Sequence, residues 1–231
     1  MSLLGRWLKR GLLVVVGLFL LWQLWLLGWV LFWGWFNPGT TRFMEIRLAE
    51  LRQKVPDAQL RQQWLPYDQI SVHLKRAIIA SEDAKFVDHE GFDWEGIQKA
   101  LEKNQKKGRY VAGGSTISQQ LAKNLFLTPT KSYFRKAEEA VITLMLETLW
   151  SKRRIFEVYL NVIEWGNGVF GAEAAARHYF NVPASRLGPE QAARLAGMVP
   201  NPRYYDRNRG APGLGRKTAI ILGRMNAVEV P

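Results

Sequence analysis

One uninterrupted apolar segment near the start of the chain places the strongest limit on what it can fold into. Between Gly11 and Phe36 there is no charged residue, and Gln23 is the only strongly polar side chain. As a helix rising about 1.5 Å per residue, this segment spans roughly 37 Å, whereas the hydrocarbon core of a bilayer is about 30 Å thick. The sequence therefore predicts a transmembrane helix over residues 11–36.

The flanking residues predict the orientation of this helix. Arg6, Lys9 and Arg10 precede it, while the uncharged stretch that begins at Asn37 follows it. Because positive residues stay on the cytoplasmic side, we expect residues 1–10 in the cytoplasm and everything after about residue 37 outside. A cleaved signal peptide is the alternative, but the apolar run is longer than the apolar region of such a peptide and no small-residue cleavage site follows. We expect a single-pass anchor.

The net charge of the chain limits the classes of partner that it can be expected to bind. The formal net charge is +12, of which three positive charges precede the anchor and +9 lie on the exported part. A surplus of this size suits nucleic acid, an anionic membrane surface or a phosphorylated substrate. An exported domain does not meet nucleic acid routinely, so membrane phosphates and an anionic lipid substrate are favoured. The chain has no cysteine, so the exported domain relies on its core rather than on disulfides.

Helical patterns dominate the exported part. Residues 37–66 read as a connector interrupted by Pro56 and Pro66, and residues 67–231 as one domain. Ser71 is expected to cap a first helix, and a second helix is expected to begin near Ser115 or Thr116. Further helices are predicted over residues 134–150, 154–163, 171–179, 189–198 and 214–227, with a turn over 166–171. Alternating β-type runs are scarce, so we predict a mainly α domain.

A first cluster of polar residues begins at the end of the first exported helix. Leu74, Ile78 and Glu82 are spaced by four, so Glu82 continues an apolar stripe at the C-terminal end of that helix. Burial and the negative end of the helix dipole both disfavour a charged carboxylate there, which predicts a raised pKa suited to a general base. A surface acidic pair of Glu82 and Asp83 that caps the helix is the alternative. His89 is either a catalytic residue or a structural residue held by hydrogen bonds, and the structural role is favoured.

A second cluster surrounds the next helix start. Glycines that lead into a capped helix leave backbone N–H groups free for an anion, and Thr116 and Gln119 have capping-box spacing. Thr116, Gln120, Lys123 and Asn124 share one unusually polar face. An ordinary solvated helix start is the alternative.

Two further clusters lie on the helices that follow. Arg135 and Glu139 are four residues apart and can pair on one helix face, although most such pairs contribute little to stability. Residues 140–149 are nearly all apolar, so Glu139 is expected where its helix enters the core. In the fourth cluster, Lys152, Ile155 and Tyr159 share a stripe that, taken alone, indicates a structural amphipathic helix.

Together and in this order, the four clusters resemble the signatures of the peptidoglycan glycosyltransferase family. The matching segments are residues 82–91, 113–124, 135–139 and 152–161, and the resemblance covers about residues 60–205. The single anchor and short chain are similar to the monofunctional branch. No serine is followed three positions later by lysine, as the nucleophile motif of a penicillin-binding transpeptidase domain requires.

The resemblance implies both an activity and a location. Its members polymerise lipid II into β-1,4-linked glycan strands by inverting transfer, with release of undecaprenyl diphosphate. It implies a lysozyme-like helical fold with a second lobe dipping into the membrane, in the bacterial inner membrane with the catalytic domain in the periplasm. The implied partners are lipid II, the growing lipid-linked strand and the membrane, and other cell-wall synthesis or division proteins are an open alternative.

The resemblance also implies roles for particular residues. Glu82 is the expected base, Glu139 the second catalytic carboxylate that orients Arg135 and the donor phosphates, and Lys123 and Arg135 the cations that face the leaving diphosphate. The expected substrate-binding residues are Asp83, Phe86, His89, Ser115, Thr116, Gln119, Gln120, Lys123, Asn124, Arg135 and Lys136. No metal-ligand cluster is recognised, and sharing of the diphosphate charge by a divalent cation, Mg²⁺ or Mn²⁺, is an open alternative. Residues 106–110 are a candidate flap.

Two other functions would explain some of these sequence features but not all of them. A membrane-bound glycan hydrolase also uses a glutamate of raised pKa, but a neutral glycan gives no reason for Lys123 and Arg135. A non-enzymatic, basic, lipid-binding membrane protein explains the charge but not the acidic residues on apolar stripes.

Overall fold

The computed structural model describes residues 3–109, 113–130 and 132–231 and divides the chain into two compact units, Met1–Asn37 and Pro38–Pro231. The first unit consists of helix α1 (Leu3–Trp35). Its segment Lys9–Trp35 is long and apolar enough to cross a membrane. Most of its leucine and valine side chains are exposed, as expected of a surface that contacts lipid. This helix fits the predicted single-pass anchor.

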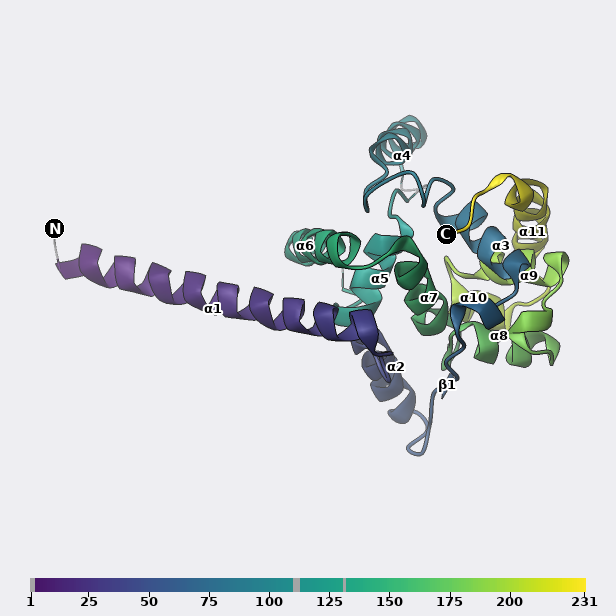
Figure 1. Cartoon of the computed structure of the whole chain (residues 1–231), viewed down its shortest axis with the longest axis horizontal. Coiled ribbons are helices and arrows are strands. Elements are labelled where there is room, and N and C mark those ends of the chain that lie inside the picture. Colours follow the sequence, from purple (N-terminus) through teal and green to yellow (C-terminus); the bar gives the residue numbers. More distant parts are fainter. Residues whose placement is uncertain (1–2, 110–112, 131) are drawn as a thin grey trace. The chain divides into compact units, whose positions relative to one another are not determined.

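The second unit is built mainly from helices, so the predicted fold class is confirmed (Figure 1). The helices are α2 (Arg42–Arg52), α3 (Val72–Glu82), α4 (Trp94–Lys107), α5 (Ile117–Phe126), α6 (Tyr133–Leu149), α7 (Lys152–Val162), α8 (Ala172–Phe180), α9 (Pro189–Met198), α10 (Pro202–Arg207) and α11 (Pro212–Arg224). Short 3₁₀ turns cover Tyr67–Gln69, Ala184–Arg186 and Met225–Ala227.

Two groups of helices meet in this unit. Helix α5 packs against α6 and α7, and α9 packs against α3 and α11, as Figure 1 shows. Leu74 and Ile78 of α3, Leu121 of α5 and Phe156 of α7 are fully buried in the core. The candidate site draws on α3, α5, α6 and α7, so the packing of these helices sets its geometry.

A small three-stranded sheet includes the segment in which a turn was predicted, and Asn167 and Gly168 form a turn there. Its strands β1 (Arg61–Gln62), β2 (Glu164–Gly166) and β3 (Val169–Phe170) lie in the order β1-β3-β2. Strand β1 runs parallel to β3 and β2 antiparallel to it. Helix α2 and strand β1 fall within the predicted connector and belong to the second unit. The predicted domain boundaries at residues 37 and 66 stay a prediction.

Local capping chemistry explains the helix starts that the sequence predicted. The Ser71 hydroxyl accepts a hydrogen bond from the backbone N–H of His73 at the start of α3. The capping box of α5 is present, since Gln119 N–H donates to Thr116 Oγ1 at 3.2 Å and Thr116 N–H donates to Gln119 Oε1 at 3.1 Å. These bonds fix the helix start next to the glycines of the second cluster.

Candidate active site

Glu82 is the last residue of α3, and its carboxylate is held by two neighbours. Gln120 Nε2 donates to Glu82 Oε2 at 3.0 Å, and the Ser81 hydroxyl donates to Glu82 Oε1 at 3.2 Å. Burial raises the pKa of Glu82, while these two hydrogen bonds and the charges of Lys217 and Lys123 act in the opposite direction. The raised pKa agrees with the prediction from the sequence. A carboxyl of this kind is suited to accept a proton.

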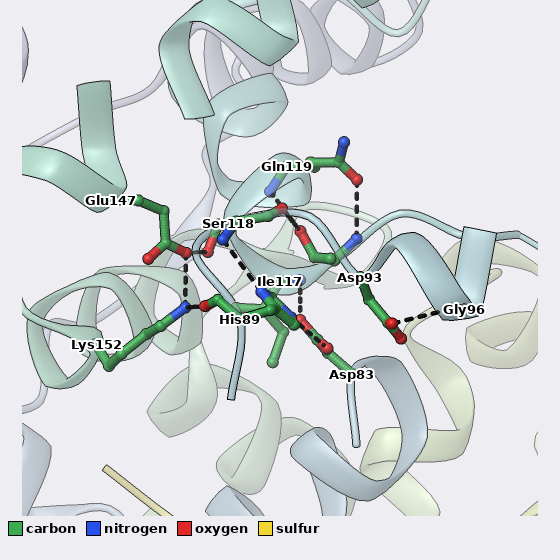
Figure 2. A network of polar contacts seen from close by, with 11 residues as sticks. Asp83, His89, Asp93, Gly96, Ile117, Ser118, Gln119, Glu147 and Lys152 are labelled. Atoms are coloured by element: carbon green, nitrogen blue, oxygen red, sulfur yellow. Dashed lines mark hydrogen bonds and ion pairs between the residues drawn. The ribbon is translucent and has the colours of Figure 1, made fainter. Parts of the chain in front are cut away.

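The loop after Glu82 is fixed by Asp83 and His89 (Figure 2). Asp83 Oδ1 lies 2.9 Å from His89 Nε2, and Asp83 Oδ2 accepts the backbone N–H of Ile117 at 3.0 Å. The Gly91 N–H donates to His89 Nδ1 at 3.1 Å, so Nδ1 is the acceptor and Nε2 carries the proton that faces Asp83. This network joins the end of α3 to the start of α5.

A second set of bonds holds the same loop from α6 and α7. Lys152 Nζ donates to the His89 carbonyl at 2.5 Å and to Glu147 Oε1 at 2.8 Å, and Ser118 also donates to Glu147 (Figure 2). Gly91 has φ +89°, and a Cβ there would lie 2.8 Å from Thr143 Cγ2. Only glycine fits such a backbone without strain. The loop therefore has little freedom next to the base.

Several predicted substrate-binding residues are already engaged within the protein. Asp83, His89, Thr116 and Gln119 make the bonds described above, and Phe86 is fully buried with its ring centroid 5.5 Å from that of Phe156. Their direct contact with substrate stays a prediction. The geometry gives them a supporting role, because they join the segments that carry Glu82 and Gln120.

The cations of α6 gather around one carboxylate. Glu139 is buried and accepts hydrogen bonds from Arg135 NH1 at 2.6 Å and from Lys136. The predicted pairing of Arg135 with Glu139 is confirmed. Lys136 Nζ also lies 3.2 Å from Ser115 Oγ. Arg135 Nε is buried without a hydrogen-bond partner in the described part of the chain. One guanidinium N–H thus remains for an external acceptor.

Lys123 differs from these paired cations. Within residues 3–109, 113–130 and 132–231, its ammonium makes no hydrogen bond and no ion pair within 4.0 Å. Burial is the main cause that lowers its pKa, and the charge of Glu139 opposes this. A partly buried ammonium without a partner is costly, so an arriving anion would be stabilised strongly there.

Two hollows flank the Glu82–Gln120 pair. A hollow of about 150 Å³ is lined by Glu82, Asp83 and Asp93 together with residues 113–116, and its described lining includes no Lys or Arg side chain. Another, of about 290 Å³, is lined by Gln120, Lys123 and Asn124 together with Arg47, Glu164 and Arg203. The base therefore lines a neutral-to-acidic space, and its partner Gln120 lines a space that contains cations. This division suits a substrate that combines uncharged sugar with phosphate.

Comparison with known proteins identifies the family of the chain. The family model described as "Transglycosylase" matches residues 49–226, which is well over half of the chain. The chain belongs to the transglycosylase family. It is 84% identical, over 231 residues and the full length of both chains, to the "Biosynthetic peptidoglycan transglycosylase" of Dechloromonas aromatica. Proteins of the same name from Azoarcus sp. and Aromatoleum aromaticum are 65% identical over 231 residues (100% of both chains) and 66% identical over 222 residues (96% of both). The resemblance predicted from the four clusters is confirmed, and the chain is a glycosyltransferase.

The candidate site of this transglycosylase includes Lys217, Arg47 and Glu164, which the sequence did not single out, and Tyr159, for which the sequence indicated only a structural helix face. Lys217 of α11 contributes a positive charge that lowers the pKa of Glu82. Arg47 Nε donates to Glu164 Oε2 at 3.2 Å, and both line the hollow that contains Lys123. The Tyr159 hydroxyl donates to Gln120 Oε1 at 2.9 Å. These residues come from remote segments, and no local spacing signals such contacts.

Two remaining predictions from the sequence concern metal ligands and the candidate flap. Within the described ranges of this transglycosylase, no group of three or more His, Cys, Asp or Glu side chains is arranged to hold a metal ion. In the candidate flap, α4 ends at Lys107 and Gly108 caps it in the left-handed conformation. Tyr110, the last residue of the flap, lies outside the described residues.

Proposed function

We propose that this transglycosylase polymerises lipid II into the β-1,4-linked glycan strands of peptidoglycan, with inversion of configuration and release of undecaprenyl diphosphate. The observation that carries the proposal is a carboxyl of raised pKa, Glu82, with the unpaired ammonium of Lys123 in its electrostatic range. The first suits removal of a proton from a sugar hydroxyl, and the second suits a diphosphate. The names of the relatives supply the peptidoglycan context.

Glu82 acts on the acceptor in this proposal. Its carboxylate takes the proton from the acceptor's 4-hydroxyl while that oxygen attacks the anomeric carbon of the donor. The bond from the anomeric carbon to the diphosphate oxygen breaks, and its electron pair leaves with the diphosphate. Attack from the face opposite the leaving group converts an α-linked donor into a β-linked product. The raised pKa of Glu82 suits this proton transfer.

Lys123 and Arg135 act on the leaving group. The charge that develops on the diphosphate meets the ammonium of Lys123 and the unpartnered Nε of Arg135. Because Glu139 already holds Arg135 and Lys136, these cations do not have to reorganise during the reaction. Glu139 is therefore proposed to act through the cations rather than on the sugar.

The proposal places the reaction at the bacterial inner membrane. Helix α1 serves as the single-pass anchor, with its basic N-terminal residues in the cytoplasm and the second unit in the periplasm. Confinement of enzyme and lipid-linked substrate to one surface raises their effective concentration. The growing lipid-linked strand is the proposed second substrate.

Lipid II itself tests the proposal. The full-length protein in detergent is incubated with purified lipid II, the products are sized and the released undecaprenyl diphosphate is quantified. We expect long strands, with diphosphate released in proportion to the disaccharides joined. A glycan hydrolase would instead shorten preformed strands and leave lipid II unchanged. A folded protein that makes no strands from lipid II would contradict the proposal.

A further inference from the structure

Tyr159 is hydrogen-bonded to the partner of the base, Gln120, and is not among the described residues that line either hollow. It is fully buried on α7, where its ring stacks on Phe156 with centroids 6.3 Å apart. Its hydroxyl donates to Gln120 Oε1 at 2.9 Å, and Gln120 Nε2 donates to Glu82 Oε2 at 3.0 Å. Three helices thus contribute one unbroken hydrogen-bond chain that ends on the carboxylate.

We propose that Tyr159 is a positioning residue that holds the amide of Gln120 in the orientation in which its NH₂ group donates to ionised Glu82. The proposal rests on the proposed role of Glu82 as the general base. It assigns the fourth cluster a part in the reaction, although Tyr159 touches neither substrate nor leaving group.

The direction of these hydrogen bonds follows from which of the three side chains can donate a proton. An ionised carboxylate only accepts, so the amide must turn its NH₂ toward Glu82 and its carbonyl toward Tyr159. The phenol supplies the matching proton. Burial, with the charge of Glu82, raises the pKa of Tyr159 well above its ordinary value, so the hydroxyl keeps that proton. Aligned hydrogen bonds of this kind polarise one another in a buried site.

The same three side chains can also serve the protonated base. Once Glu82 has taken a proton, its carboxyl can donate to the Gln120 carbonyl. A half-turn of the amide then directs its NH₂ group to the Tyr159 oxygen, which accepts as readily as it donates. Without the hydroxyl, one end of this buried amide is unpaired in either state. Tyr159 therefore keeps the amide paired in both states, and its support is larger for the ionised state, in which the amide donates to a charged carboxylate.

Other charges act on Glu82 and are left unchanged by removal of the hydroxyl. Lys217 of α11 and Lys123 of α5 both lower the pKa of Glu82, and Asp83 acts on Tyr159 from the neighbouring position. In Tyr159→Phe the ionised carboxylate loses the support relayed through Gln120. Its protonated form is favoured, so the acid limb of the pH–rate profile should move to higher pH.

The test measures kcat/KM for lipid II polymerisation against pH, with the full-length protein and its Tyr159→Phe variant. For Tyr159→Phe we expect kcat/KM to fall about tenfold on the acid side, because the acid limb moves by roughly one pH unit. On the plateau kcat/KM should recover substantially, and KM should change little. Tyr179→Phe is the matched control, since that hydroxyl donates to the Trp165 carbonyl at 2.8 Å, outside the chain that ends on Glu82. Its acid limb should coincide with that of the wild type.

A double variant separates relay from packing. If Tyr159 acts through Gln120, adding Tyr159→Phe to Gln120→Met should leave the acid limb where Gln120→Met alone places it. An unchanged limb in Tyr159→Phe, an equal loss at every pH, or additive effects in the double variant would overturn the proposal. A wild-type protein inactive on lipid II would overturn the proposed function instead. If Tyr159→Phe fails to fold, Tyr159→3-fluorotyrosine serves instead, because it keeps the ring and has a hydroxyl that donates more strongly. The acid limb of the pH–rate profile should then move to lower pH. An acid limb that stays in place would contradict the proposal.

Discussion

At the scale of single residues, Lys123 and Arg135 are the side chains proposed to stabilise the leaving diphosphate. Lys123 is partly buried without an ion pair in the described residues, and Arg135 keeps one unpartnered N–H. Lys123→Ala and Arg135→Ala should each lose about 2–4 kcal/mol of transition-state stabilisation, measured as kcat/KM with lipid II. The matched control Lys103→Ala removes an exposed lysine of α4 and should change little. Equal losses in the binding of lipid-linked and lipid-free glycans would indicate that the two cations are merely structural.

Glu82 is also expected to lower the stability of the fold near neutral pH. Its folded-state pKa is raised above the ordinary value of 4.5, so its contribution to stability is fully present below that value and is lost as pH rises through the folded pKa. Glu82→Gln keeps the shape without the charge. Its melting temperature should therefore exceed that of the wild type by a margin that grows with pH, as thermal melts followed by circular dichroism can measure. A margin that shrinks as pH rises would contradict the assigned direction of the pKa.

The sequence singled out Glu82, Lys123 and Arg135 as candidates because each lies within one motif on one helix. It could not reveal that Lys217 acts on Glu82 or that Tyr159 holds Gln120, because these contacts depend on how α3, α5, α7 and α11 pack. It also left the roles of His89 and Asp83 open. The structure shows both residues hydrogen-bonded to each other within the loop after α3.

At the scale of elements, helix starts were predicted best where the capping chemistry is local. Ser71 and the Thr116–Gln119 box supplied such signals for α3 and α5. Helix α4 was not assigned from the sequence, because Ala100 is the buried residue of this helix and its apolar stripe is correspondingly weak. Strands β1, β2 and β3 are two or three residues long, too short to show alternation.

The loop between α3 and α4 can be tested at Gly91. Its φ is +89°, and a Cβ would lie 2.8 Å from Thr143 Cγ2 and 3.0 Å from Glu147 Cγ. Gly108 also has a positive φ, +61°, but nothing within 4 Å of a Cβ, which makes it a matched control. Gly108→Ala should cost about 1 kcal/mol of folding free energy and Gly91→Ala about 2 kcal/mol more, in denaturant titrations. Equal costs would show that the loop adapts and that its packing does not fix the site.

At the scale of the whole molecule, the anchor α1 is expected to be separable from a catalytic unit, Pro38–Pro231. A chain that begins near Phe43 would remove Thr41, whose hydroxyl caps α2 by accepting the Met44 N–H at 3.2 Å. A start at Pro38, where the second unit begins, keeps this cap. This truncated protein should fold, stay mainly helical and polymerise lipid II supplied in detergent. It should do poorly on lipid II in vesicles, because the anchor no longer concentrates it at the membrane.

Residual vesicle binding is expected from the second unit. Tyr133 and Phe134 of α6 are 95% and 91% exposed, and the exported part carries +9. The electrostatic share of this binding should weaken as salt is raised. A truncated protein that is folded yet inactive in detergent would show that α1 helps to build the site, and the division into anchor and catalytic unit would then be wrong.

The most direct measurement of the central claim compares wild-type protein with Glu82→Gln on lipid II in detergent. Gln keeps the shape of Glu82 but accepts no proton at working pH, so strand formation should fall by about 10²–10⁴-fold. Circular dichroism checks that both proteins keep the same helical content. We expect this loss in a variant that remains folded. Strand formation by Glu82→Gln at close to the wild-type rate would contradict it and remove Glu82 from the role of base.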